Sequence, residues 1–306
     1  MPYVHNLTLG LPHTNHRGLS EPLLLMHAGH FQWMSIAAAT GGPLSRLRTA
    51  SGGEVYAAFY YIEERFPEAT PLESFGLDDD LRFVIELRSF KNIAVEGRLL
   101  FDRPERLADN ARVAAALAPG ATDGAHPFIR FGNIFVTPFK GNSVLRVAPP
   151  VSADFSKLTP LRNDDNPYHL TRAASEGRGL GVLGDRWLVL GTFDHRYRID
   201  VDRDTNGAGL VYFANYAVFM ETAERLALES LALPVPQDRL ERRSLTHRRV
   251  AYYGNADVSD TIDVRVTILQ SPESPHSLGF RFAIERHEDR QTICLSEAVK
   301  RVPPPR

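Results

Sequence analysis

The residues best suited to chemistry lie in one glycine-rich segment of the chain. This segment reads NGAGLVYFANY at residues 206–216 and continues as AVFMETA at residues 217–223. Its second part is small and apolar on nearly every side, which predicts a helix enclosed by a sheet, and we expect that helix to open at Gly209. Asn206 cannot take a proton or attack a carbonyl, but its amide can donate a hydrogen bond to a developing oxyanion. The segment therefore favours stabilisation of negative charge over hydrolysis.

Alternating apolar and polar residues predict the strands that must hold this helix. In the first half, apolar residues recur at every second position over residues 81–87 and again over residues 95–101, after an expected hairpin at residues 90–92. In the second half, the same alternation covers residues 261–268, 278–284 and 293–299, with a turn at residues 286–290. One apolar and one polar face are typical of antiparallel strands with one face on a core and one face in water.

Each half also carries one long helix ahead of its strands. In the first half we expect the helix to start after Ser20 as N-cap, with Pro22 in its first turn. In the second half, Gly209 occupies the corresponding place. A helix followed by strands, twice over, is the pattern of a degenerate internal duplication.

Length and patterning together predict the domain organisation. A chain of 306 residues exceeds the size at which one hydrophobic core stops growing. We expect two units, residues 1–148 with a connecting segment and residues 149–306. An alanine-rich helix is expected at residues 110–117, and the fold class is α+β.

Composition excludes several classes of function. Hydrophobic residues make up 43% of the chain and charged residues 24%, as in ordinary soluble domains. The formal net charge of −2 gives no basic field, so we expect no nucleic-acid partner. No apolar run approaches the roughly 20 residues of a membrane span, and the N-terminus has no signal-peptide pattern. We therefore expect a cytoplasmic protein that binds no membrane.

Other candidate motifs fit structural roles better. Cys294, the single cysteine, lies in an alternating run and is expected to pack as a strand residue. The glycines at residues 177–184 precede an apparent strand at residues 187–193 instead of following one, which argues against a dinucleotide-binding loop. His27 and His30 have helical spacing, but no carboxylate or cysteine completes a metal set, so we expect no metal.

The segment at residues 206–223 resembles the signature of hot-dog-fold acyl-thioester enzymes. In that fold a curled antiparallel sheet wraps a long helix, whose amino end faces the thioester carbonyl. The thioesterases of this kind carry an aspartate, as nucleophile or base, where this chain has Asn206. With two helix-and-strand units, the resemblance implies a double hot dog with its site at the junction of the units.

Over its whole length, the chain resembles the leinamycin-type bifunctional acyltransferase/decarboxylase family, whose members are double hot dogs. The resemblance is carried by residues 18–21, 29–33, 53–59, 206–216 and 251–256. It implies decarboxylation of a malonyl- or methylmalonyl-type CoA thioester and transfer of the resulting acyl group to an acyl carrier protein in polyketide biosynthesis. The CoA thioester and the carrier protein are then the partners, no cofactor is needed, and a homodimer is left open.

The same resemblance implies site residues. Tyr56 and Thr70 join Asn206 as catalytic residues. Tyr56 is either an acyl-accepting nucleophile, which needs a phenol pKa well below about 10, or a hydrogen-bond donor to the enolate, the role we favour. The substrate-binding residues are Gly209, Leu210, Tyr212, Asn215, Asn255 and His30. The structural alternatives are a strand aromatic packed on the helix for Tyr56 and a turn or cap residue for Thr70 and Asn255.

Two other functions stay open. One is a thioesterase or dehydratase-like double hot dog acting on acyl-CoA or acyl carrier protein, and the other is a non-catalytic scaffold that binds an acyl carrier. Asn206 in place of an aspartate argues against hydrolysis, and the presence of Tyr56 argues against the scaffold.

Overall fold

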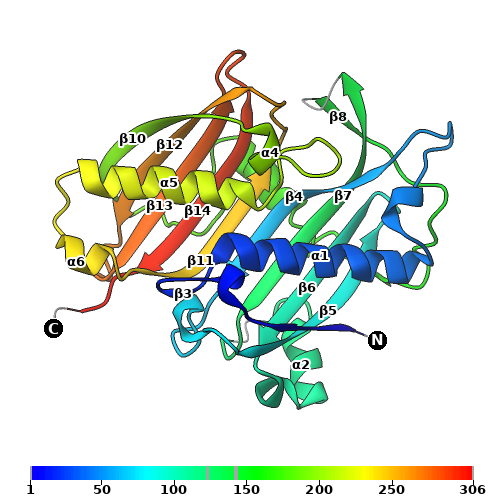
Figure 1. Ribbon diagram of the computed structural model, residues 1–306, viewed down its shortest axis with the longest axis horizontal. Helices are drawn as coiled ribbons and strands as arrows, with labels where there is room; N and C mark the ends of the chain where they lie inside the picture. The colour runs from blue at the N-terminus through cyan, green and yellow to red at the C-terminus, as the bar shows by residue number, and fades with distance from the viewer. Residues whose placement is uncertain (1, 122–123, 141–143, 305–306) are drawn as a thin grey trace. The chain divides into compact units, whose positions relative to one another are not determined.

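The computed structural model describes residues 2–121, 124–140 and 144–304 (Figure 1). Contacts between Cα atoms separate two units: Met1–Phe139 with Leu145–Tyr168, called unit 1, and Lys140–Val144 with His169–Arg306, called unit 2. The boundary expected at residues 148/149 falls inside unit 1 and stays a prediction. In the described part of the chain, no helix is long and apolar enough to cross a membrane.

Unit 1 is an antiparallel sheet that carries one long helix (Figure 1). Its elements are β1 (Tyr3–Thr8), η1 (Leu11–His13), β2 (Thr14–Asn15), β3 (Gly18–Leu19), α1 (Glu21–Thr40), η2 (Leu44–Arg46), β4 (Tyr56–Arg65), η3 (Leu72–Ser74), β5 (Asp80–Phe90), β6 (Ala94–Asp102), η4 (Pro104–Leu107), α2 (Asn110–Leu117), β7 (Phe128–Lys140), β8 (Val144–Val147) and β9 (Thr159–Pro160). The strand order is β1-β5-β6-β7-β4, with β8 paired to β7 and β9 parallel to β5. The hairpin expected at residues 90–92 is confirmed, because it joins β5 to β6.

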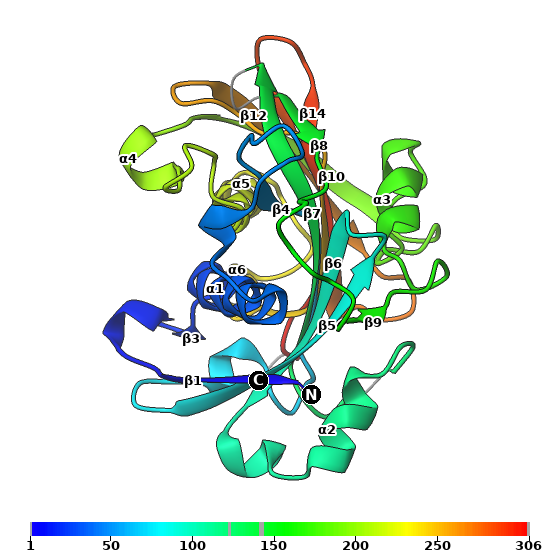
Figure 2. The same ribbon diagram turned by 90° about the vertical axis from the view of Figure 1, so that its right-hand side faces the viewer.

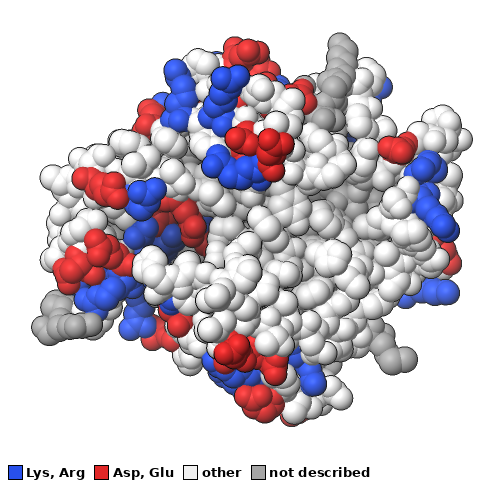
Figure 3. Space-filling view, in the orientation of Figure 1, with Lys and Arg blue, Asp and Glu red and all other residues white. Residues whose placement is uncertain are grey.

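Helix α1 has almost no charged residues, and half of its twenty residues are buried. Ser20 is the N-cap and Pro22 lies in the first turn, as predicted, and the helix ends at Gly41, whose φ of 78° is left-handed. Glu21 is the only charged residue of the helix, and it is buried. Figure 3 accordingly shows almost no Lys, Arg, Asp or Glu on the surface over α1.

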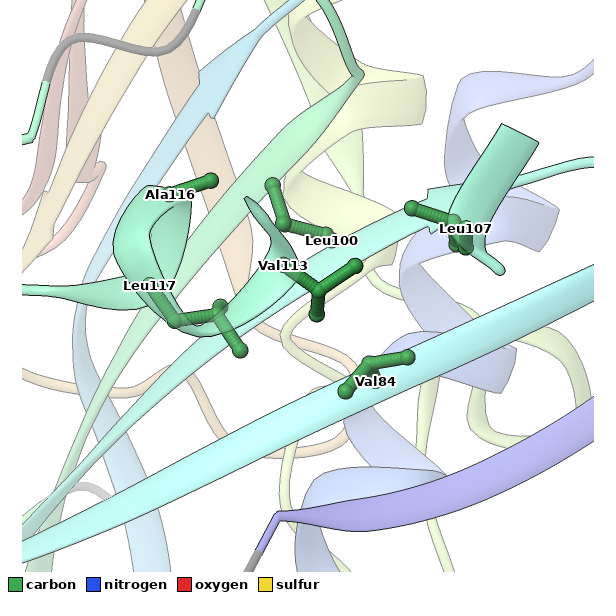
Figure 4. Packing of buried hydrophobic residues seen from close by; sticks show 6 residues of the cluster. All are labelled: Val84, Leu100, Leu107, Val113, Ala116 and Leu117. Atoms are coloured by element: carbon green, nitrogen blue, oxygen red, sulfur yellow. The ribbon is translucent and has the colours of Figure 1, made fainter. Parts of the chain in front are cut away.

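The far face of this sheet is covered as well, which the alternation did not predict. Figure 2 shows α1 and α2 on opposite faces of the sheet of unit 1. Helix α2 has the predicted bounds, and the Asp109 carboxylate caps it by accepting hydrogen bonds from two backbone amides. It packs on β5 and β6 through six buried residues, Val84, Leu100, Leu107, Val113, Ala116 and Leu117 (Figure 4). All nine residues of β6 are therefore buried, where one polar face in water was expected.

Unit 2 repeats the arrangement with a second antiparallel sheet and helix. Its elements are α3 (Tyr168–Ser175), β10 (Leu188–Arg198), α4 (Val201–Asp204), α5 (Asn215–Ser230), α6 (Gln237–Leu240), β11 (Ser244–Tyr252), β12 (Thr261–Gln270), β13 (Ser277–Arg286) and β14 (Thr292–Arg301). The strand order is β11-β14-β13-β12-β10. Figure 2 shows α5 and α3 on opposite faces of this sheet. The three strands predicted in this half are confirmed, and so is the turn between β13 and β14.

The alternation in β12 shows how unit 2 forms its core. Ile262, Val264, Val266 and Ile268 are fully buried, while Arg265 between them is exposed. Strand β12 contacts α5, so the apolar side of the strand meets the apolar helix. Helix α5 begins at Asn215, however, and the start expected at Gly209 was wrong.

Helix α5 carries a buried carboxylate that forms ion pairs with two cations. Glu224, on α5, is fully buried; Lys300 Nζ lies 2.9 Å and Arg243 Nε 2.5 Å from its carboxylate. Burial alone raises the pKa of Glu224, but the two cations outweigh that effect and lower the pKa to about 2. The carboxylate is thus ionised at neutral pH, and its single negative charge is shared by the buried Lys300 and the half-buried Arg243, which would otherwise be costly to remove from water.

We expect Glu224→Gln to destabilise the protein by about 3–5 kcal/mol, because the buried Lys300 and the half-buried Arg243 lose their counter-charge. Urea unfolding followed by circular dichroism measures this. Because the folded-state pKa of Glu224 is lowered, its stabilisation is complete above the ordinary glutamate pKa of about 4.3 and is lost as the pH falls towards 2. The variant should lack this acid-dependent loss.

Glu229→Gln, at an exposed pair on the same helix, is the control and should change stability by less than about 1 kcal/mol. Equal losses of stability in the two variants would contradict the assignment.

A glycine on β6 makes room for a polar side chain of α1. Gln32 is fully buried, and its Nε2 donates to Asn133 Oδ1 of β7 at 3.1 Å. A Cβ atom at Gly97 would lie only 1.8 Å from Gln32 Oε1. The close approach of helix and sheet at this point therefore requires glycine.

We expect Gly97→Ala to cost about 1–3 kcal/mol of unfolding free energy, because the new methyl group overlaps a side chain held in place by Asn133. Gly42→Ala is the control, since a Cβ atom there meets nothing within 4 Å. Removing the obstacle with Gln32→Ala should make the double variant more stable than the sum of the single losses predicts. Chemical denaturation of the four proteins checks this, and a Gly97→Ala protein as stable as Gly42→Ala would refute it.

Candidate functional site

Asn206 closes the turn that precedes α5. Its backbone N–H donates to the Leu210 carbonyl at 2.8 Å, and Gly209, with a φ of 71°, donates back to the Asn206 carbonyl at 2.9 Å. The side-chain Oδ1 accepts from the backbone amides of Ala208 and Leu210, at 2.9 and 3.2 Å. Because both partners are donors, the oxygen of the amide must face the turn, which leaves Nδ2 as the outward donor. Among the described residues, Nδ2 has no hydrogen-bond partner.

The same loop holds the other residues predicted from this segment. Tyr212 N–H donates to the Asp204 carbonyl at 2.8 Å, and Asn215 Nδ2 donates to the Arg203 carbonyl at 3.1 Å. Burial raises the pKa of Tyr212 to about 12, so its hydroxyl stays protonated. Gly209 and Leu210 lie in this turn and not at the helix end, and the loop leads directly into α5 at Asn215. The structure thus gathers one set of predicted residues into a single loop of unit 2.

Tyr56 is the first residue of β4, in unit 1. Its partner in the register is Val136 of β7, and its hydroxyl donates to Glu54 Oε2 at 3.0 Å. Burial, and after it the adjacent Glu54 carboxylate, raise the pKa of Tyr56 above its usual value, against a weaker opposing effect of Arg48. An acyl-accepting phenolate needs the opposite shift. The surroundings of Tyr56 suit a protonated hydroxyl that donates a hydrogen bond.

Comparison with known proteins gives a likeness of fold. No protein-family model matches the chain, and no curated protein matches its sequence. A solved structure described as an oleoyl thioesterase from Lactobacillus plantarum matches with a TM-score of 0.68 and 12% identity, over 100% of this chain and 96% of that one. An acyl-ACP thioesterase from Bacteroides thetaiotaomicron has a TM-score of 0.57 and 9% identity (98% and 97% covered). A 12:0-ACP thioesterase from Umbellularia californica has a TM-score of 0.59 and 9% identity (99% and 98% covered).

The fold is a double hot dog. Each unit described above supplies one long helix and one antiparallel sheet to it, and the predicted fold class is confirmed. Identities of 9–12% extend the likeness to the fold alone.

Two further residues predicted for the site, Thr70 and His30, also lie in unit 1. Thr70 follows the far end of β4, a strand of ten residues that spans about 30 Å. Its buried Oγ1 has no hydrogen-bond partner among the described residues, and its backbone N–H donates to the Pro67 carbonyl in a turn. His30 is exposed on α1. Thr70 thus lies beyond the far end of the strand that Tyr56 begins. His30, in contrast, lies one helical turn before Trp33, whose Nε1 donates to the Ala57 carbonyl next to Tyr56 at 3.1 Å.

Asn255 lies in the loop after β11, in unit 2. It is buried, its carbonyl accepts from Arg286 Nη1 at 3.2 Å, and its Nδ2 has no partner among the described residues. Three residues earlier, the Tyr252 hydroxyl donates to the Phe213 carbonyl at 3.1 Å. This bond joins the end of β11 to the loop that contains Asn206.

Two carboxylates at these places were missed by the sequence analysis. Glu54 accepts the hydrogen bond from Tyr56, and its position two residues earlier in an extended segment places it on the same side, a signal that was available. Asp204 is buried and accepts from the Tyr197 hydroxyl at 2.7 Å and from the Asp200 amide at 2.8 Å, which anchors the start of the loop. The contact of Asp204 with Tyr197, seven residues earlier at the end of β10, follows from no motif in the sequence.

Metal and thiol chemistry have little support in the described residues. Among them, no group of three or more His, Cys, Asp or Glu residues could hold a metal ion. Cys294 is fully buried in β14, as predicted for a strand residue, and burial raises the pKa of its thiol. A thiol in that state is a poor nucleophile.

Proposed function

We propose that the protein decarboxylates a malonyl- or methylmalonyl-type CoA thioester and transfers the acyl group to an acyl carrier protein. The observation that carries the proposal is the fixed amide of Asn206, whose oxygen is used by two backbone donors and whose Nδ2 is left to donate. Such a group stabilises negative charge but cannot activate water. The fold, which is that of proteins named as acyl thioesterases, supports a thioester as substrate.

The proposed chemistry has two steps. The bond from the α-carbon to the substrate carboxylate breaks, CO2 leaves, and its electron pair passes into the thioester as an enolate. Donors at the enolate oxygen lower this barrier, and a proton then adds to the α-carbon to give the acyl-CoA. In the second step the carrier thiol attacks the thioester carbonyl, its proton is lost, and CoA leaves as the thiolate that takes up a proton.

In this proposal Tyr56 donates a hydrogen bond and does not carry the acyl group. Its raised pKa supports that role, because a phenol that stays protonated is a donor at neutral pH; its one O–H, which binds Glu54 Oε2 in this structure, turns to the enolate oxygen when substrate binds. Thr70 and the substrate-binding residues keep the roles that the family resemblance implies, as proposals.

Hydrolysis is the second candidate. The three structural neighbours are named as thioesterases, and Glu54 supplies a carboxylate beside Tyr56 that can act as a base towards water. The amide at Asn206 argues against this candidate. A direct assay separates the two activities.

Intact mass analysis of a holo carrier protein, incubated with the chain and malonyl- or methylmalonyl-CoA, tests the proposal. Appearance of an acetyl or propionyl carrier supports decarboxylation with transfer. Free CoA with an unloaded carrier would establish the thioesterase instead. Carrier binding without turnover would support the non-catalytic scaffold that binds an acyl carrier instead.

Tyr56→Phe should slow CO2 release by about 10²- to 10³-fold, the usual effect of losing one oxyanion donor, while the protein stays folded. Release of ¹⁴CO2 from labelled substrate measures the rate. The competing role predicts another result: transfer to the carrier would be abolished, CO2 release would be unchanged, and wild-type protein without carrier would accumulate an acyl-tyrosine. Normal CO2 release by Tyr56→Phe would reject the donor role.

Asn206→Asp should convert the protein towards hydrolysis. The new carboxylate can accept the same hydrogen bonds from Ala208 and Leu210, so the turn is kept while a base replaces a donor. We expect acyl-CoA hydrolysis without carrier to rise roughly 10²-fold, within the usual range for a positioned base, and CO2 release to fall. A thiol-reactive dye measures free CoA, with Asn206→Ala as the control that loses CO2 release without gaining hydrolysis. If both variants kept the wild-type rate of CO2 release, Asn206 would have no catalytic role.

A further inference from the structure

Three arginines with no carboxylate partner gather at one end of unit 1. They are Arg46 and Arg48, in the segment of residues 44–55, and Arg146 on β8. Together with the exposed Phe139, Val147 and Val151 they are called here the basic surface. Figures 1 and 2 show β8 and the segment of residues 44–55 at the same end of the unit.

Hydrogen bonds hold the parts of the basic surface together. The Val151 amide donates to the Arg48 carbonyl at 3.0 Å, and the Arg48 amide donates to Ser152 Oγ at 3.1 Å. The Arg146 guanidinium lies over the Phe139 ring, 3.1 Å from its centre. The surface is therefore part of the folded unit and is built from two segments about a hundred residues apart in the chain.

The charges of this surface are not neutralised by the protein itself. Among the described residues, Arg46 and Arg146 form no ion pair. The guanidinium of Arg48 donates only to the backbone carbonyls of Ser45 and Leu47. Most other arginines of unit 1 are paired with a carboxylate, as Arg98 is with Glu96 at 2.8 Å. Over residues 44–56 and 145–152 the one acidic residue is Glu54, whose carboxylate accepts a hydrogen bond from the Tyr56 hydroxyl and, among the described residues, forms no ion pair with an arginine.

Apolar side chains lie among these charges. Val147 is 55% exposed, Val151 66% and Phe139 45%. Single exposed apolar residues are ordinary, but several beside unpaired arginines are typical of a surface that docks a partner. The surface also reaches Tyr56 directly, since Arg48 and Glu54 are joined by a backbone bridge and Glu54 contacts the phenol.

We propose that the basic surface docks the acidic acyl carrier protein that receives the acyl group; this inference rests on the proposed function. The carrier brings a phosphodiester on its prosthetic arm, and acidic side chains around it complement the three arginines. The exposed valines and Phe139 supply apolar contact between the charges. A second copy of this chain fits less well, because a two-fold interface through this surface would place arginines against arginines.

The test measures binding without turnover. The probe is a fluorescently labelled apo form of the carrier used in the mass assay, which lacks the arm, and its anisotropy is read at low salt. Arg46→Glu/Arg146→Glu should raise the Kd at least roughly tenfold through lost charge complementarity. Arg112→Glu is the matched control, an exposed arginine on α2 on the other face of the sheet, and its Kd should stay within about twofold of the wild type. Equal Kd values for the double variant and the control, or no binding by the wild type, would overturn the proposal.

A second measurement separates the carrier from the phosphate groups of CoA. The double variant should raise the KM for holo carrier as acceptor but leave transfer to free pantetheine, which has neither phosphate nor protein, at the wild-type rate. An equal loss with pantetheine would reveal a structural effect, and an equal loss of affinity for CoA would assign the surface to CoA; either result overturns the proposal. Wild-type binding of carrier without acyl transfer would reject the proposed function and leave the docking surface standing.

Discussion

Burial of an apolar helix against one face of an antiparallel sheet is the constraint on which each unit depends. Helix α1 has a single charged residue, Glu21, and could not remain in water by itself. Strands present alternate side chains to opposite faces, so a strand such as β12 offers the helix a continuous apolar side. The remaining elements complete this layer by closing its ends or, as with α2, by covering the outer face of the sheet.

Inside this layer a polar or charged side chain is costly unless it has a partner. Glu224 is tolerated on α5 because Lys300 and Arg243 surround its carboxylate, and the pair energy offsets the loss of hydration. On α1 the solution is neutral: Gln32 donates to Asn133, and Gly97 leaves space for its amide. The two helices thus bury polar residues in different ways. The carboxylate on α5 is compensated by ion pairs, whereas the amide on α1 is accommodated by a hydrogen bond and by the space at a glycine.

The candidate chemistry depends on groups whose protonation and orientation are set by their neighbours. Two backbone amides fix the orientation of the Asn206 side chain, and burial, together with the carboxylate of Glu54, raises the pKa of the Tyr56 phenol. Both residues are therefore prepared as hydrogen-bond donors, which suits a reaction that develops negative charge on oxygen. Close to Tyr56, Arg48 is bridged to Glu54 through the backbone and forms no ion pair among the described residues, which would favour an anion on the proposed basic surface.

Local patterns in the sequence by themselves determined the strands β5, β6, β12, β13 and β14, the hairpin at residues 90–92, the bounds of α2 and the N-cap at Ser20, because alternation, turns and caps are encoded by near neighbours. They also placed Asn206 in the turn ahead of the long helix, but they put Tyr212 inside that helix, whereas Tyr212 lies in the loop before it. Only the tertiary structure decided that α5 begins at Asn215, that Thr70 follows the far end of β4, and that α2 covers the second face of the sheet. These features depend on contacts between segments distant in the chain, and no periodicity within one segment records which of its faces another segment will cover.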